Sequence, residues 1–515
     1  MRKYIFFFLF CILLTACGTH RSVISSTSGT KGEKPAKEVR YNIEYKGLPW
    51  VENISKPINI TRGLQNKHLS VWASHGRYYD QNKDIWKWQR PNMFCTNEDL
   101  FTQTIVVPYL IPMLENAGAI VFTPRERDWQ KNEVVVDNDD ETKLPYYTEI
   151  NIGRKWEDAG TRGFAASKKE YGGRENPFND GTARMAAASP SKECEISYQP
   201  RFAQSGEYAV YVSYPTHKRS VPDAKYIVYH KGRRTVFSVN QRMGGGTWVY
   251  LGTFEFDQGC NSANRVVLTN ESAYQGVVTA DAVRFGGGMG LIARDGKTSG
   301  LPKCLEGARY YAQWAGAPES VYRAKNGTDD YKEDIYTRPF MTNWLVGGSC
   351  FAPDDKGLNV PIELALAVHS DAGYSKDYSS LVGSLAICTT NTGNGLLASG
   401  YSRRKSKTLA SMLLDNANND IVKTYGKWNI RNLYDRNYAE TRCPVVPSAI
   451  IETLSHQNFP DMFMAQDPNF RFTLARSIYK SILRFNSEMH DTKCVVTPLA
   501  PINVSTEFFA GDTII

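Results

Sequence analysis

The sequence predicts an α/β fold interrupted by an antiparallel β-sandwich. From about residue 67 to residue 128, short apolar strands alternate with segments of helical spacing. From about residue 147 to residue 288 the apolar residues recur with a period of two, and after residue 289 the α/β pattern returns. A single α/β domain with a whole domain inserted into one of its surface loops explains this order most simply.

The first α/β stretch predicts strand, helix and strand. "HLSVWASHGRYYD" indicates a strand that runs into a turn, and "AIVFTPRERD" indicates a second strand. Between them, Phe101, Ile105 and Tyr109 recur at intervals of four, as on one face of a helix. Pro108 and Pro112 lie inside this pattern, and an interior proline removes a helical hydrogen bond. We therefore expect a kink or two consecutive short helices.

The middle stretch predicts several short antiparallel strands. In "GEYAVYVSYP" the residues Tyr208, Val210, Val212 and Tyr214 share one face of a strand. The alternation continues in "AKYIVYHKGRRTVFSVNQ", "TWVYLGTFEF", "RVVLTN" and "TADAVRF", with turns rich in Gly and Asn between them. This spacing is typical of a sandwich.

The second α/β stretch contains two buried strands and two long helices. "ELALAV" and "VVPSAIIETL" are apolar runs of strand length. Leu409, Leu413, Ala417 and Ile421 mark one helix face, and Gly426 is a good helix stop. A last helix is expected around residues 474–485, followed by a tail, 492–515, with no clear period.

Composition excludes some classes of function. The chain has 515 residues, 42% hydrophobic and 22% charged, and its formal charge is +8. No block of Lys and Arg is long enough to argue for nucleic acid as a partner. Eight cysteines lie beyond Cys17, and eight allow 105 disulfide pairings, so spacing selects none. Without a CxxC pair, a thiolate zinc site is not expected.

The N-terminus resembles a bacterial lipoprotein signal. "MRK" and the apolar "YIFFFLFCILL" form an export signal, and Leu14-Thr15-Ala16-Cys17 resembles a lipobox, whose Cys is lipidated. The alternative is an ordinary signal peptide cut after Ala16. We expect a signal peptide over 1–16, a flexible tether over 17–45, and a membrane anchor at Cys17. The basic, polar residues after Cys17 favour an outer-membrane lipoprotein that faces the periplasm.

Four residues at predicted strand and helix ends suggest a zinc site. His75 and His369 each end an apolar strand, where ligands of open α/β sheets bind. Glu98 lies at a predicted helix start and Glu452 at the end of "SAIIE". A catalytic zinc keeps three protein ligands and one open position, and a further carboxylate can accept a proton from water. No HExxH helix is present, so spacing alone is weak support for a zinc enzyme.

The same residues carry a family resemblance. "WASHGRYYD", "NEDLFTQTIVVPYLIPMLENAGAIVFTPRERD", "ELALAVHSDAGY" and "SAIIETLSHQNFPD" resemble, in order, the motifs of the zinc-dependent type-3 N-acetylmuramoyl-L-alanine amidases. The resemblance implies a three-layer α/β/α domain over 46–146 and 289–491 that cleaves peptidoglycan. It implies Zn²⁺ ligands at His75, Glu98 and His369 and a catalytic base at Glu452. Asp371 is expected to orient His369.

Some residues depart from this family pattern. The family usually has a Gly-rich turn where this chain has Gly76-Arg77-Tyr78-Tyr79, and Asn where it has Asp371. These departures leave open the alternative that the protein is a non-catalytic lipoprotein that binds a glycan.

The inserted stretch, 147–288, resembles a different family. "GEYAVYVSYP", "AKYIVYHKG", "VNQRMGGGTWVYLGTFEF" and "TADAVRF" are similar to the golvesin C-terminal-like domain, also described in xanthan lyases. The resemblance raises a polysaccharide lyase as an alternative, and it implies that Tyr214, Trp248 and Tyr250 could stack on sugars. On alternating strands, aromatic side chains are more often core residues than a binding platform. A glycan of the cell envelope is the expected partner in each case.

Overall fold

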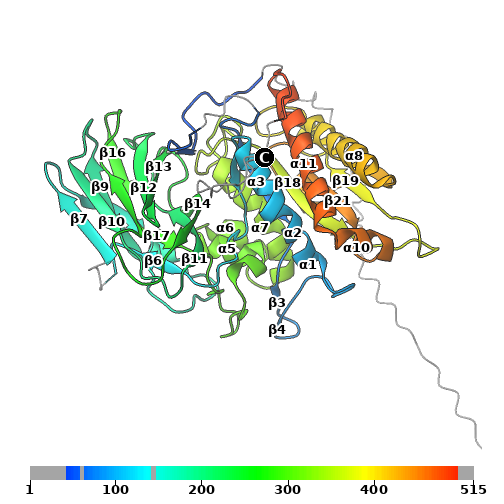
Figure 1. Ribbon diagram of the computed structural model, residues 1–515, viewed down its shortest axis with the longest axis horizontal. Helices are drawn as coiled ribbons and strands as arrows, with labels where there is room; N and C mark the ends of the chain where they lie inside the picture. Colours follow the sequence, from blue (N-terminus) through cyan, green and yellow to red (C-terminus); the bar gives the residue numbers. More distant parts are fainter. Residues whose placement is uncertain (1–41, 58–62, 141–145, 497–515) are drawn as a thin grey trace, which may run out of the picture. The chain divides into compact units, whose positions relative to one another are not determined.

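The computed structural model describes residues 42–57, 63–140 and 146–496 (Figure 1). The predicted signal peptide, most of the tether with Cys17, and nearly all of the C-terminal tail lie outside the described residues. Within the described part, helices and strands are mixed and the strands form several sheets. No helix of that part is long and apolar enough to cross a membrane.

The α/β part is built on one six-stranded, mostly parallel sheet. Its strands lie in the order β20 (Ile430–Asp435), β19 (Ser384–Cys388), β21 (Ser448–Ser455), β18 (Ile362–Asp371), β2 (His68–Ala73) and β5 (Ile120–Phe122). β18 pairs in parallel with β2 on one side and β21 on the other. All of β18 is buried except its last residue, as the apolar run predicted.

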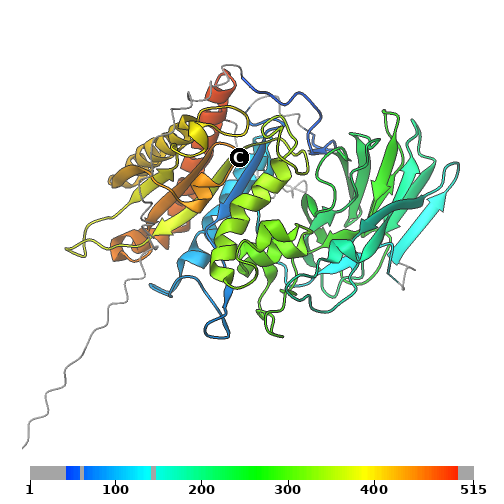
Figure 2. The same cartoon turned by 180° about the vertical axis from the view of Figure 1, so that it is seen from behind.

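Helices cover both faces of this sheet (Figure 2). On one face, Val71, Leu366 and Ile451 pack in a core with residues of α3 (Ile111–Asn116), α8 (Arg404–Tyr425) and α11 (Pro468–Met489). On the other face, Ala367 and Ile450 share a core with residues of α7 (Asp330–Val346) and of the sandwich. Burial of apolar surface in these two cores is the main stabilising contribution.

The first helical stretch is divided into consecutive short helical segments, as the sequence predicted. It runs through α1 (Glu98–Phe101), α2 (Gln103–Ile105), one π-helical turn η1 (Val106–Leu110) and α3. Pro108 lies in the π turn and Pro112 in the first turn of α3. Since proline has no backbone N–H, the helical hydrogen-bond pattern is shifted at this point.

The sandwich part consists of three antiparallel sheets. The six-stranded sheet has the order β1 (Val51–Asn53), β13 (Arg233–Val239), β12 (Ala224–His230), β15 (Arg265–Thr269), β10 (Cys194–Tyr198) and β7 (Tyr147–Asn151). The four-stranded sheet is β14 (Val249–Phe256), β11 (Gly206–Val212), β17 (Val283–Phe285) and β6 (Val134–Val136). The three-stranded sheet is β16 (Val277–Ala280), β9 (Gly181–Ala187) and β8 (Glu157–Gly163).

Two strands lie on the other side of the predicted domain boundaries. β1 and β6 precede residue 147, yet β1 pairs with β13 and β6 pairs with β17. The segment 46–146 therefore contributes strands to both the sandwich and the α/β sheet. Each of these strands has three residues, too few to show a period in the sequence.

The remaining elements are short. They are the hairpin β3 (Tyr78–Asp80) and β4 (Ile85–Lys87), the helices α5 (Ala308–Trp314), α6 (Glu319–Tyr322), α9 (Ala439–Arg442) and α10 (Phe459–Ala465), and the 3₁₀ turns η2 (Pro177–Asn179), η3 (Lys303–Leu305) and η4 (Gly393–Gly395).

Candidate metal centre

Two histidines and a glutamate converge at the carboxyl end of the parallel strands. One ligand atom from each of His75, Glu98 and His369 lies within 4.8 Å of the others. All three side chains are buried, with exposed fractions of 2%, 2% and 8%. Among the described residues, no other group of three His, Cys, Asp or Glu side chains meets this spacing.

The topology of the sheet explains this convergence. β2 and β18 are parallel neighbours, so His75, just after β2, and His369, near the end of β18, leave the sheet at the same edge. Glu98 is the first residue of α1, which is capped by the side chain of Asn97. The hydroxyl of Thr102 donates to the Glu98 carbonyl and accepts from the Ser74 N–H, which holds α1 beside the end of β2.

Glu98 is the charged centre of the cluster. Its Oε1 lies 2.9 Å from His369 Nδ1, and its Oε2 lies 3.3 Å from both His75 Nε2 and Arg90 Nε. Burial alone would raise the pKa of Glu98, but the two imidazoles lower it well below its usual value. Glu98 is therefore an anion that faces two ring nitrogens.

Glu452 lies at the same level of the sheet as this cluster. It is the register partner of His369 across β21 and β18, and its Oε2 is buried without a hydrogen-bond partner. Burial raises the pKa of Glu452 to about 8, an effect that His369 opposes and Glu98 reinforces. A carboxyl group with this pKa can accept and return a proton near neutral pH.

Three further side chains belong to the site and were not among the predicted residues. Asp99 Oδ1 lies 3.1 Å from His75 Nδ1, and Glu440 Oε2 lies 3.1 Å from His369 Nε2. His456 is buried, and its Nδ1 lies 3.9 Å from Glu98 Oε2. Asp99 and His456 had a usable signal in the sequence, because they lie in the same motifs as Glu98 and Glu452, whereas Glu440 lies outside the quoted motifs.

The structure gives Asp371 a different partner from the predicted one. Its carboxylate forms an ion pair with Arg431 at 2.8 Å rather than contacting His369. The strand explains this difference, because His369 and Asp371 are separated by Ser370 at the irregular end of β18, where the register with β21 shifts. Glu440 of α9 is the carboxylate that meets His369 Nε2.

The three sandwich aromatics do not form an exposed platform. Tyr214 is buried, accepts from Trp50 Nε1 at 2.9 Å and donates to the Met243 carbonyl at 2.8 Å. Trp248 is buried, and its ring centroid is 4.8 Å from that of Phe164 and 5.2 Å from that of Phe178. Tyr250 is half-buried, and the Arg127 guanidinium lies 4.0 Å from its ring centroid. Tyr214 and Trp248 are therefore core residues rather than a sugar-stacking platform, and Tyr250 packs against the core with part of its surface exposed.

The residues of the cluster fit a divalent transition-metal ion. His75 Nε2 is buried, makes no hydrogen bond and lies 3.3 Å from the Glu98 carboxylate. The two rings approach edge to face, with centroids 5.5 Å apart, so a nitrogen of each can face the same carboxylate. Two imidazoles and one carboxylate are the donor set of many catalytic zinc sites.

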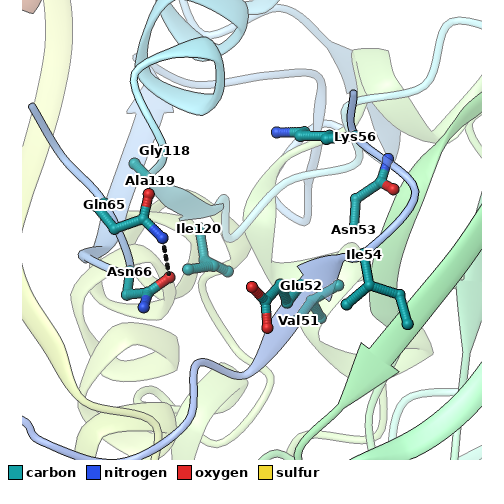
Figure 3. Close-up of a pocket in the computed structure, with 10 residues that line it drawn as sticks. All are labelled: Val51, Glu52, Asn53, Ile54, Lys56, Gln65, Asn66, Gly118, Ala119 and Ile120. Atoms are coloured by element: carbon teal, nitrogen blue, oxygen red, sulfur yellow. Dashed lines mark hydrogen bonds between the residues drawn. The ribbon is translucent and has the colours of Figure 1, made fainter. Parts of the chain in front are cut away.

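A cavity lies elsewhere, away from this cluster. It has a volume of about 340 Å³ and is lined by residues 51–54, Lys56, Gln65, Asn66 and 118–120 (Figure 3). Ile120 begins β5, so this cavity lies at the amino end of the parallel strands. None of the cluster residues lines it, so it is not part of the candidate centre.

One family model matches part of the sandwich. Residues 166–287, which contain β9 to β17, match the family described as the golvesin C-terminal domain. A xanthan lyase from Bacillus sp. (strain GL1) is 35% identical over 92 residues, which are 18% of this chain and 10% of that protein. The chain thus spans about a tenth of the length of this curated relative. The predicted golvesin resemblance is confirmed for the matched segment.

Solved structures resemble parts of the chain. A Paenibacillus xanthan lyase aligns with 30% of this chain and 13% of its own at 24% identity and a TM-score of 0.24. The CwlD amidase from Clostridioides difficile, solved with the GerS lipoprotein, aligns with 34% of this chain and 73% of its own at 16% identity and a TM-score of 0.23. The N-acetylmuramoyl-L-alanine amidase AmiC2 of Nostoc punctiforme aligns with 25% of this chain and 60% of its own, at 13% identity and a TM-score of 0.20. TM-scores this low do not assign a function to this chain.

Proposed function

We propose that this protein is a zinc-dependent hydrolase that cleaves the amide between N-acetylmuramic acid and L-alanine in peptidoglycan. The observation that carries the proposal is the meeting of His75, Glu98 and His369 within 4.8 Å, with Glu452 in register beside His369. The proposal includes the three-layer amidase-like arrangement of the α/β part. It also includes a lipid anchor at Cys17 in the outer membrane, facing the periplasm.

The side chains have distinct roles in this reaction. His75, Glu98 and His369 would hold Zn²⁺, which when bound supplies a Lewis acid that lowers the pKa of water to about 7. Glu452 accepts a proton from the attacking water and returns it to the nitrogen of L-alanine as the C–N bond breaks. The raised pKa of Glu452 suits both steps, because the group gains and loses a proton near neutral pH.

A second candidate is a glycan-binding protein or a polysaccharide lyase. The observation that favours it is the match of residues 166–287 to the golvesin domain and of a short segment to a xanthan lyase. Residues 166–287 contain none of His75, Glu98, His369 and Glu452. Because Tyr214 and Trp248 are buried, Tyr250 is the one residue of the three predicted for sugar stacking that is partly exposed.

Digestion of peptidoglycan distinguishes these candidates. The full-length protein, loaded with Zn²⁺, is incubated with purified peptidoglycan, and the new chain ends are identified by mass spectrometry. An amidase releases intact stem peptides with a free L-alanine amine. Shortened peptides, or unsaturated sugars that absorb in the ultraviolet, would contradict the proposal, and so would the absence of any cleavage by zinc-loaded protein.

A further inference from the structure

We propose that Asp99 and Glu440 are positioning residues, each of which fixes the tautomer and orientation of one metal-binding imidazole. The inference rests on the proposed function, because it assigns to His75 and His369 the role of metal ligands. It concerns the tautomer and orientation of the two imidazole rings in the metal-free protein.

The first pair is His75 with Asp99. The two nitrogens of His75 face opposite ways: Nε2 lies 3.3 Å from Glu98 Oε2 and Nδ1 lies 3.1 Å from Asp99 Oδ1. Asp99 is fully buried, and its two oxygens accept the backbone N–H groups of Gln89 and Arg90 at 3.1 and 3.0 Å. Because two backbone donors hold this carboxylate, it has a fixed position 3.1 Å from Nδ1.

The second pair is His369 with Glu440. Here Nδ1 lies 2.9 Å from Glu98 Oε1, and Nε2 lies 3.1 Å from Glu440 Oε2. The other oxygen of Glu440 accepts from Trp72 Nε1 at 2.7 Å and from Arg338 Nη1 at 2.9 Å.

The two rings therefore present different nitrogens to Glu98. His75 presents Nε2 and His369 presents Nδ1, and each has its remaining nitrogen at a buried carboxylate. A neutral imidazole binds a metal only through the nitrogen that lacks a proton, so the two rings must be held in opposite tautomers. The nitrogens that keep their protons belong to different rings and face different carboxylates. Asp99 and Glu440 can therefore each fix the tautomer of one ring.

The contacts at 3.1 Å have the separation of hydrogen bonds, although neither is aligned as one. Among the described residues, Asp99 and Glu440 are the carboxylates at hydrogen-bonding distance from the outward nitrogens. A carboxylate behind a ligating histidine also raises the basicity of the ring, and its loss typically lowers metal affinity by about 10- to 100-fold.

The test measures zinc affinity rather than hydrolysis. Full-length wild-type protein, Asp99→Asn and Glu440→Gln are prepared metal-free and titrated with Zn²⁺ against a chromophoric chelator. We expect each substitution to weaken zinc binding by about 10- to 100-fold. Thermal unfolding of the metal-free proteins is recorded in parallel, so that a loss of folding is separated from a loss of affinity.

Glu363→Gln is the matched control. Glu363 is a buried carboxylate on the same strand, β18, and its Oε2 lies 2.5 Å from His490 Nε2. This substitution also removes a negative charge from a buried imidazole, but at the opposite end of the strand. We expect Glu363→Gln to leave zinc affinity unchanged even if it lowers the melting temperature.

Each outcome has a distinct meaning. Zinc affinities of Asp99→Asn and Glu440→Gln within twofold of wild type would overturn this inference and leave the proposed function standing. Failure of the wild type to bind zinc would overturn both. If Glu440→Gln does not fold, Trp72→Phe removes one donor to Glu440 and keeps the carboxylate. Zinc affinity of Trp72→Phe several-fold below wild type supports the role of Glu440, and unchanged affinity contradicts it.

Discussion

Glu452 and His369 are register partners on the parallel strands β21 and β18, so the proposed base and a proposed ligand lie side by side near the carboxyl ends of these strands. Zinc binding and proton transfer are therefore assigned to different residues, because Glu452 lies beside the cluster of proposed ligands and is not a member of it. A substitution at Glu452 should therefore affect the reaction without emptying the site.

The first prediction concerns Glu452→Gln. The amide cannot accept the proton of water, and general base catalysis contributes about 10²- to 10⁴-fold. We expect kcat to fall by at least about 100-fold, with the zinc content of the purified protein unchanged. Peptidoglycan release assays and elemental analysis of the same samples check this. Loss of zinc together with activity would instead place Glu452 among the ligands.

The second prediction concerns metal removal. Zinc that binds the folded state alone stabilises it by about 2.7 kcal/mol at a free concentration of 100 times Kd. We expect a chelator to lower the Tm of the wild type and added Zn²⁺ to restore it, as followed by differential scanning fluorimetry. His75→Ala serves as the control, since it removes a proposed ligand. A Tm of this variant that responds to zinc like the wild type would count against His75 as a ligand.

The third prediction concerns a buried ion pair between the α/β part and the sandwich. Arg284 Nη1 lies 2.6 Å from Glu126 Oε2, both side chains are fully buried, and the Tyr211 hydroxyl donates to the same carboxylate. Because Glu126→Gln leaves a buried guanidinium without its main counter-charge, we expect a loss of about 3–5 kcal/mol in the free energy of unfolding. Urea denaturation measures this loss.

Glu255→Gln is the control for that experiment. Glu255 pairs with Lys231 at 3.2 Å, but the two side chains are 60% and 45% exposed. Water screens such a pair, so the expected change is below about 1 kcal/mol. Equal effects of the two substitutions would show that burial does not determine the contribution of the Arg284 pair.

The fourth prediction concerns pH and Asp281. Burial raises the pKa of Asp281 to about 7, although Ser213 and the backbone N–H of Phe164 donate to its carboxylate. The folded state thus binds this proton more tightly than the unfolded state does, so stability falls as pH rises from about 4 to about 7. Asp281→Asn cannot lose the proton. We expect its free energy of unfolding, relative to that of the wild type, to increase as the pH rises from 5 to 8.

Urea denaturation at both pH values gives this difference directly. At about 1.4 kcal/mol per pH unit, the two units between pH 5 and the pKa of about 7 give a relative change of at most about 3 kcal/mol. A difference between Asp281→Asn and wild type that stays constant from pH 5 to pH 8 would contradict the raised pKa.

Much of the candidate site could be predicted because strand ends and helix starts are visible in the sequence. His75, His369 and Glu452 follow apolar runs of strand length, and Glu98 follows the good N-cap residue Asn97. Parallel pairing then brings the strand ends together at one edge of the sheet. Glu440 could not be predicted in this way, because it reaches His369 only through the packing of the short helix α9.

The aromatic residues of the sandwich show a second limit of prediction from the sequence. Alternation identifies the two faces of a strand but does not say which face meets solvent. In β11, residues 208–212 are all buried, so both faces are covered. Tyr214 and Trp248 are therefore core residues despite a pattern that also suits a sugar-binding surface.

The pairing of β1 with β13 and of β6 with β17 has a consequence for dissecting the protein. Removing residues 147–288 as a separate fragment would leave β1 and β6 without their pairing partners. The backbone donors and acceptors of β13 and β17 that face them would then be exposed at two strand edges. Such edges recruit other chains. The chain before residue 147 thus completes two sheets of the sandwich. A truncated sandwich with its sheets intact must include residues 51–53 and 134–136 as well as the insert.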